Sequence, residues 1–100
     1  MAALIWTHKA AEQLEQVRVF IAADSPTQAR RVVRLIVQKT RELRAHPRIG
    51  RMIPEMRQDQ YRELLVFSYR IFYRMVSADE VHVLAVVHGR RSFDPHWLQQ

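Results

Sequence analysis

The 100-residue sequence contains no cysteine, only two glycines and only two lysines among its 16 basic residues. The lack of cysteine excludes a disulfide framework, a thiolate metal site and a cysteine nucleophile. No hydrophobic run approaches the length of a membrane span. The apolar start MAALIW gives way at once to polar Thr7 and His8, unlike a signal peptide. We therefore expect a cytosolic protein with no membrane partner.

The basic residues that are present are mostly arginines, and the formal net charge is +6. Arginine makes planar, bidentate contacts with carboxylates and phosphates and stacks on bases. This balance indicates an acidic partner, either nucleic acid or an acidic protein segment, although a surface that is merely basic is the alternative. The hydrophobic content of 48% favours a folded chain, and the length fits one domain over residues 1–100.

The first half of the sequence predicts one strand and two helices. Residues 3–6 form a short apolar run typical of a strand. Thr7 offers a helix N-cap, and one helical face follows: Ala10, Leu14, Val17 and Ile21. Ser25, Pro26 and Gln28 form a second helix start, and this helix is expected to run to about Ala45. Two helices joined by a short turn form an αα-hairpin.

The second half predicts a connector and three strands. The segment HPRIGRMIPEM contains two prolines and a glycine and is expected to be irregular. Strand signals follow at 61–67, 69–76 and 81–88, with a polar hairpin turn at 77–80. The tail SFDPHWLQQ is expected to form a short helix or turn that packs Trp97 back. The order β-α-α-β-β-β predicts an α+β domain with the helical hairpin on one face of a mostly antiparallel sheet.

The stretch YRIFYRMV places arginines on the middle of this sheet. Alternation predicts one face with apolar residues in its centre and basic residues around them, formed by Arg62, Leu64, Val66, Arg70, Phe72, Arg74, His82, Leu84, Val86 and His88. The opposite, more apolar set suits covering by the helices: Leu65, Phe67, Ile71, Tyr73, Val83, Ala85 and Val87. An exposed apolar patch rimmed by charge indicates a binding site for an acidic amphipathic segment. The alternative is that the C-terminal tail covers Leu84 and Val86.

Two further basic features have weaker functional interpretations. A stripe on the second helix (Arg30, Arg34, Arg41 and Arg44) is interpreted as a solvated face that assists steering toward a polyanion. The segment His88–Arg91, joined by Arg51, predicts a cationic site in which arginine stabilises phosphorane charge and histidine moves protons. His82 and His88 lie about 20 Å apart on an extended strand and cannot share a metal ion. We expect neither a metal nor a cofactor.

Six motifs in order carry a resemblance to a known family. They are Trp6-Thr7, Asp24-Ser25-Pro26, PRIGR at 47–51, RELLV at 62–66, YRIFYR at 69–74 and VHGRR at 87–91. Together they resemble the RelE/ParE superfamily of toxins from type II toxin–antitoxin modules, most closely the ParE, or plasmid stabilisation, branch. The resemblance implies a small bacterial cytosolic toxin with the RelE/ParE fold. It also implies a cognate antitoxin whose C-terminal segment wraps the toxin.

The two branches of the superfamily imply different targets. A ParE-like toxin inhibits DNA gyrase by binding, whereas a RelE-like toxin cleaves mRNA on the ribosome without a metal. The RelE-type cations correspond to Arg51, Arg62, Arg70 or Arg74, and Arg91, and the proton carrier to His88 or His96. This sequence departs from the RelE pattern because it has no lysine cluster before the sheet and no tyrosine after Arg91.

We therefore expect a ParE-like toxin that stops growth by binding gyrase. The alternative is a RelE-like endoribonuclease with Arg51, Arg62, His88 and Arg91 at its catalytic site, and a third possibility is a toxin fold that has lost toxicity. The residues expected to bind partners are Arg62, Arg70, Phe72, Arg74, Leu84, Val86, His88, Arg90 and Arg91.

Overall fold

Two hydroxyl caps fix where the helices begin in the computed structural model, which describes all residues 1–100. After strand β1 (Ala3–Trp6), Thr7 Oγ1 accepts a hydrogen bond from the Ala10 N–H at 3.1 Å and starts helix α1 (His8–Ala22). Ser25 Oγ accepts from the Gln28 N–H at 3.1 Å and starts helix α2 (Pro26–Arg41). Both predicted helix starts are confirmed. Helix α2 ends earlier than the predicted Ala45, because the chain tightens into a 3₁₀ turn, η1 (Glu42–Arg44).

The sheet has five strands in the order β1-β5-β4-β3-β2. Its other members are β2 (Arg51–Met52), β3 (Tyr61–Val66), β4 (Tyr69–Ser77) and β5 (Glu80–His88). Strand β1 runs parallel to β5 and the remaining pairs are antiparallel, which confirms the predicted α+β class. Strand β2 is an addition, since its residues were predicted to be an irregular connector.

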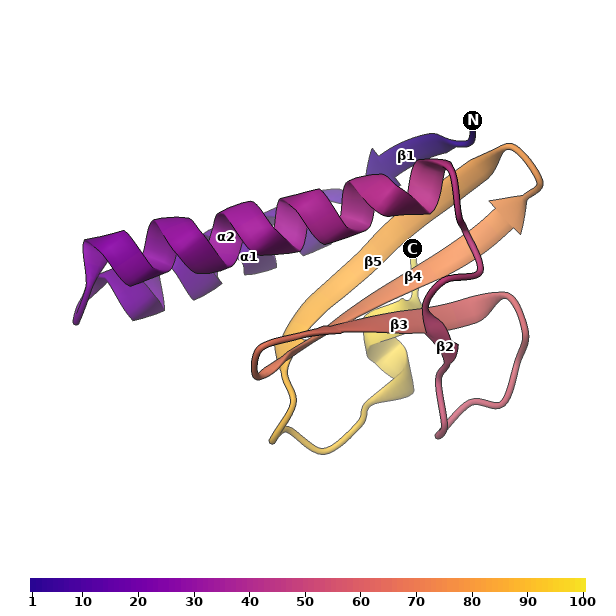
Figure 1. The fold of residues 1–100 in the computed structure, drawn as a ribbon. Coiled ribbons are helices and arrows are strands. Elements are labelled where there is room, and N and C mark those ends of the chain that lie inside the picture. The colour runs from indigo at the N-terminus through magenta and orange to yellow at the C-terminus, as the bar shows by residue number, and fades with distance from the viewer.

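The helices and the C-terminal segment cover opposite faces of the sheet (Figure 1). The two helices lie together on one face, and the C-terminal 3₁₀ helix η2 (Pro95–Leu98) lies beneath the other. On the helix side a core forms from Ala10, Val17, Val32, Ile36, Val66, Tyr69, Ile71, Val83 and Val86. Neither helix is long and apolar enough to cross a membrane.

The strand register differs from the predicted division into faces. Leu64 pairs with Ile71 and Val66 with Tyr69, so these β3 residues face the helices. Leu65 pairs instead with Arg70, and both point away from the helices. The parity of a single strand does not fix its pairing with the next strand, and a one-residue slip exchanges the faces.

A bulge in β5 reverses the alternation a second time. Phe72 pairs with Ala85 and Tyr73 with Val83, so that Leu84 is the extra residue. Beyond the bulge, Val86 pairs with Ile71 on the helix side and Val87 with Arg70 on the other. The predicted faces were therefore wrong for the following residues: Arg62, Leu64, Leu65, Val66, Ala85, Val86, Val87 and His88.

The chain itself fills the apolar centre of the second face. Phe72 and Leu84 are fully buried there, in a cluster with Ile53, Ala85, Val87, Trp97 and Leu98. Phe72 stacks on Trp97 with ring centroids 6.0 Å apart, and Phe93 meets both rings edge-on. The alternative that the tail covers this face is confirmed for Leu84, whereas Val86 lies beneath the helices. The open groove expected on this face is absent.

A buried tyrosine fixes the segment that leads into β2. The Tyr73 hydroxyl donates to the Pro47 carbonyl at 2.6 Å and accepts from the Gly50 N–H at 3.0 Å. A Cβ added at Gly50 would lie 2.6 Å from both that hydroxyl and the Glu63 carbonyl, which is closer than atoms approach. Glycine at position 50 thus lets the connector reach the edge of the sheet.

Candidate functional site

A buried carboxylate holds the arginines on the face that the tail covers. The Glu63 side chain on β3 is fully buried, and its two oxygens accept from Arg51 Nε at 2.6 Å and Arg70 Nε at 2.5 Å. The two terminal nitrogens of Arg70 donate to both oxygens of Glu55, at 2.9 and 2.7 Å. Arg70 is therefore neutralised by two carboxylates, and its charge is committed within the fold.

The ion pair between Glu55 and Arg70 shifts the pKa of both side chains in the expected directions. Glu55, and to a lesser extent Glu63, raise the pKa of Arg70, while burial opposes them. The hydrogen bonds from Arg70 hold the pKa of Glu55 below its ordinary range. The guanidinium of Arg70 also lies 4.9 Å from the Phe72 ring centroid and 5.8 Å from that of Phe93. Arg70 thus links the connector, the sheet and the C-terminal tail.

The other arginines of the predicted binding face are also engaged. Arg62 donates to the Asp59 carboxylate at 2.7 Å and to the Gly50 carbonyl at 3.0 Å. Arg74 lies 5.8 Å from the Tyr61 ring centroid, and its buried Nε has no hydrogen-bond partner. Arg62 and Arg70 are thus committed to carboxylates, whereas Arg74 packs on Tyr61 without an ion pair, and the three do not form a free cationic rim.

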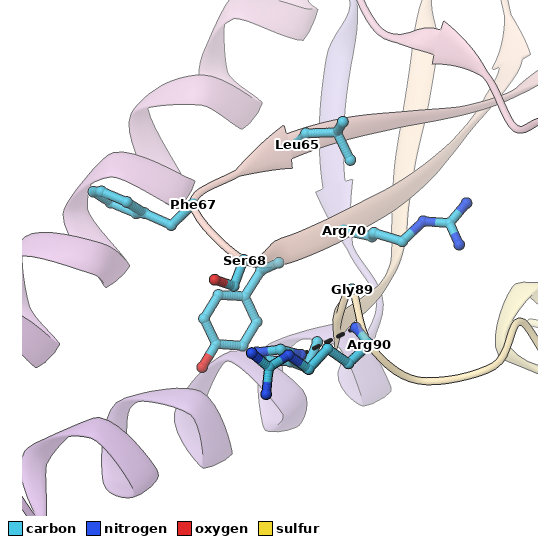
Figure 2. Close-up of a pocket in the computed structure, with 8 residues that line it drawn as sticks. Leu65, Phe67, Ser68, Arg70, Gly89 and Arg90 are labelled. Atoms are coloured by element: carbon cyan, nitrogen blue, oxygen red, sulfur yellow. Dashed lines mark hydrogen bonds between the residues drawn. The ribbon is translucent and has the colours of Figure 1, made fainter.

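A groove opens instead where β4 begins and β5 ends (Figure 2). Two adjoining hollows of about 240 and 400 Å³ share Tyr69 and His88 in their walls, and we call them together the Tyr69–His88 groove. The first is also lined by Leu65, Phe67, Ser68, Arg70, Gly89 and Arg90. The second extends to α1 and is also lined by Gln13, Gln16, Val17, Phe20, Val86, Val87 and Arg91.

Large apolar side chains stand exposed around this groove. Phe20 is 74% exposed, Leu65 58% and Phe67 54%. Phe67 occupies the tight turn between β3 and β4 with φ of 51°, a left-handed conformation that a bulky residue rarely adopts. Its side chain projects away from the sheet in Figure 2, and the Arg31 guanidinium lies 6.0 Å from its ring centroid. A strained backbone that presents an aromatic ring to solvent is typical of a binding surface.

Unpaired cations flank the apolar part of the groove. His88 meets the Tyr69 ring edge-on at 5.4 Å, and its Nδ1 accepts from the Arg90 N–H at 3.1 Å. Burial raises the pKa of the Tyr69 hydroxyl. Arg90 and Arg91 are exposed and form no ion pair, although the Arg91 guanidinium lies over the Trp97 ring. The groove thus combines exposed aromatic surface with free positive charge.

The predicted catalytic residues do not come together. Arg51 on β2 is three strand spacings from β5, or about 14 Å across the sheet. Arg62 on β3 pairs with Tyr73 on β4, and Tyr73 pairs with Val83 on β5. Val83 precedes His88 on β5 by five residues, so Arg62 is far from His88. The expectation that Arg51 would join the His88–Arg91 segment was wrong, because the short strand β2 holds Arg51 at the far edge of the sheet. No group of three His, Asp or Glu side chains is placed to hold a metal ion.

Sequence reasoning found one side of the groove and missed the other. Five predicted partner-binding residues line the groove: Arg70, Val86, His88, Arg90 and Arg91. Phe20, Leu65, Phe67 and Tyr69 were not predicted to bind partners. Phe20 carried a signal, because it is a large aromatic residue outside the apolar stripe of α1. Leu65 and Phe67 were assigned to the helix-covered face by the parity that the register overturns.

The Glu63 network predicts a measurable loss of stability. In Glu63→Gln, one of the two buried oxygen acceptors becomes an amide donor that faces the donor of Arg51 or of Arg70, and the buried negative charge is lost. We therefore expect a loss of about 2–3 kcal/mol in the free energy of unfolding. Chemical denaturation of both proteins measures it. Glu15→Gln, which removes the exposed partner of Arg18, is the control and is expected to change little. Equal effects of the two variants would contradict the role given to Glu63.

The Glu55–Arg70 pair predicts a pH dependence. The pKa of Glu55 is lowered from its ordinary 4.5 in the fold, so the pair stabilises above that pH and is lost as pH falls through the folded pKa. The difference in melting temperature between the protein and Glu55→Gln is therefore expected to be largest near neutrality and to shrink below pH 4.5. Melting curves across this range measure it. A difference that does not vary with pH would contradict the assignment.

Comparisons with known proteins agree with this architecture. Residues 4–93 match the family described as the ParE toxin of type II toxin-antitoxin system, parDE. Among solved structures, a chromosomal ParDE TA system from P. aeruginosa superposes with a TM-score of 0.70 and 24% sequence identity, over 88% of this chain and 96% of that one. A search of curated proteins gives no significant match. Because the family match spans most of the chain, the protein belongs to the ParE toxins of type II toxin–antitoxin systems.

Proposed function

We propose that this ParE toxin stops growth by binding and inhibiting DNA gyrase, and that a cognate antitoxin neutralises it by occupying the Tyr69–His88 groove. The observation that carries the proposal is that some arginines are paired with carboxylates and others are free. Arg51, Arg62 and Arg70 are committed to carboxylates within the fold. The free cations Arg90 and Arg91 lie beside exposed aromatic surface, an arrangement suited to binding a protein.

The groove defines what the antitoxin segment must carry. Phe20, Leu65 and Phe67 would pair with apolar residues on one side of that segment, and Arg90 and Arg91 with acidic residues beside them. An amphipathic acidic helix meets both requirements, since its anchors recur every three or four residues along one face. The fold shared with a chromosomal ParDE TA system supports a partner of this kind.

The ribonuclease alternative rests on His88 with Arg90 and Arg91. A histidine can transfer protons and nearby arginines can stabilise phosphorane charge in metal-independent phosphodiester cleavage. However, His88 Nδ1 already accepts a backbone hydrogen bond, and the ring edge packs against Tyr69. The remaining predicted catalytic arginines, Arg51 and Arg62, lie across the sheet, so they add no charge to a cation cluster at His88. Gyrase inhibition by binding is therefore the better-supported function.

Two assays on the same purified protein separate the candidate functions. We expect the protein to inhibit DNA supercoiling by gyrase and to leave mRNA intact on programmed ribosomes. Gyrase inhibition is expected to need no proton transfer by the His88 ring, so His88→Ala is not expected to remove a catalytic step. Cleavage of ribosome-bound mRNA that His88→Ala abolishes, with supercoiling unaffected by the unmodified protein, would overturn the proposal in favour of the ribonuclease.

The strained turn gives a sharp test of the antitoxin surface. Phe67→Gly removes an exposed aromatic anchor and relieves the left-handed backbone, so it is expected to weaken antitoxin binding tenfold or more, by about 1.4 kcal/mol or above, without lowering the melting temperature. Isothermal titration calorimetry and thermal melting measure the two effects.

Val19→Ala is the matched control for Phe67→Gly. Val19 is equally exposed, at 54%, but does not line the groove. We expect its antitoxin affinity to stay unchanged. If Val19→Ala weakened binding as much as Phe67→Gly, the antitoxin would lie along α1 rather than in the groove.

A further inference from the structure

The free positive charge of this protein is concentrated on helix α2. Pro26–Arg41 contains Arg30, Arg31, Arg34, Lys39 and Arg41 and not one Asp or Glu. Elsewhere five arginines are paired with acids, namely Arg18, Arg48, Arg51, Arg62 and Arg70. The other five, spread over several elements, form no ion pair: Arg44, Arg57, Arg74, Arg90 and Arg91. On α2 no arginine forms an ion pair, and the contact of Lys39 with Glu42 is long, at 4.0 Å. The net charge of +6 is thus unevenly distributed.

Three of these arginines form a straight line on the solvent side of the helix. Arg30, Arg34 and Arg41 are all exposed, and at 100° per residue they fall within about 40° of one another around the axis. We call them the α2 stripe. From Arg30 to Arg41 it extends about 16 Å along the helix. The opposite side of α2 is buried against the core through Ala29, Val32 and Ile36, so the stripe faces away from the sheet.

The neighbours of the stripe suit phosphate better than a protein surface. No large apolar side chain is exposed anywhere on α2. Protein interfaces take most of their affinity from buried aromatic and apolar anchors, and none is available here. The exposed neighbours are instead Thr27, Gln28 and Gln38, hydroxyl and amide groups that bond to phosphate oxygens.

The geometry also separates double-stranded DNA from the other polyanions. Single-stranded nucleic acid is held by aromatic stacking between cations, and the stripe has no aromatic residue in it. The major groove of an RNA duplex is too deep and narrow for side chains to read. The major groove of B-DNA is about 12 Å wide and admits a helix, with phosphates on both edges.

From these observations we propose that the α2 stripe is a sequence-independent binding surface for the phosphate backbone of duplex DNA. Arg30, Arg34 and Arg41 would each contact a phosphate, with Gln38 and Thr27 as hydrogen-bonding neighbours. The stripe residues do not line the Tyr69–His88 groove, so DNA and an antitoxin segment would occupy different surfaces. The proposal is independent of gyrase inhibition and goes beyond it.

Salt dependence of binding is the first test. Fluorescence anisotropy would follow binding of the full chain to two labelled duplexes of unrelated sequence. Three phosphate contacts predict a slope of about −2.7 in a plot of log affinity against log salt concentration, the same for both sequences. A slope near zero, or strong preference for one sequence, would overturn the proposal.

Two triple variants with the same loss of charge provide the second test. Arg30→Gln, Arg34→Gln and Arg41→Gln together are expected to reduce affinity for the duplex at least tenfold and to bring the slope close to zero. The control combines Arg18→Gln, Arg48→Gln and Arg57→Gln, which removes three exposed charges outside α2 and is expected to retain the slope. Equal losses in the two variants would show that only net charge matters and would overturn the proposal.

Competing polyanions complete the experiment. A single-stranded RNA of equal length, an RNA duplex and polyglutamate are offered to the unmodified protein under the same salt conditions. We expect each to bind more weakly than duplex DNA. Tighter, stripe-dependent binding of RNA or of polyglutamate would assign α2 to that partner and overturn the DNA proposal. Circular dichroism melting of both triple variants establishes that a loss of binding is not a loss of fold.

Discussion

The buried carboxylate of Glu63 is the interaction on which the second face of the sheet depends. A charge without water is costly unless partners surround it, and Arg51 and Arg70 supply those partners from the strands on either side. Through Arg70 the same carboxylate reaches Glu55 in the connector and the rings of Phe72 and Phe93. Strand β2, the connector and the tail therefore all depend on one side chain of β3.

This network has a functional consequence because it removes charge from the surface. Arg51, Arg62 and Arg70 are neutralised by carboxylates, so neither a phosphate nor an acidic segment gains much by approaching them. Exposed arginines without an ion pair gather at two other places, the Tyr69–His88 groove and helix α2. The groove borders exposed aromatic side chains, whereas no large apolar side chain of α2 itself is exposed. These surroundings, rather than the total charge, give the two surfaces different expected partners.

Much of the fold could be predicted from local signals in the sequence. The Thr7 and Ser25 caps act through atoms three residues away, and alternation along β4 identified the strand itself. The residues of the groove depended on relations that no short stretch contains. Leu65 and Val86 changed faces because register is set between strands and because Leu84 is an extra residue. The role of Glu63 had no signal in a short stretch of sequence, since its partners Arg51 and Arg70 are distant along the chain.

The bulge at Leu84 determines which face of the sheet each side chain at the end of β5 occupies. Before it, His82 and Leu84 lie on the face that carries Arg74, and an uninterrupted strand would place His88 there too, beneath the tail. The inserted residue rotates the remainder of the strand by half a turn and carries His88 to the edge of Tyr69. Because of this single extra residue, Val86 joins the core beneath the helices and Val87 joins the core beneath the tail. In this toxin, the geometry of the groove is a property of strand length as much as of side-chain identity.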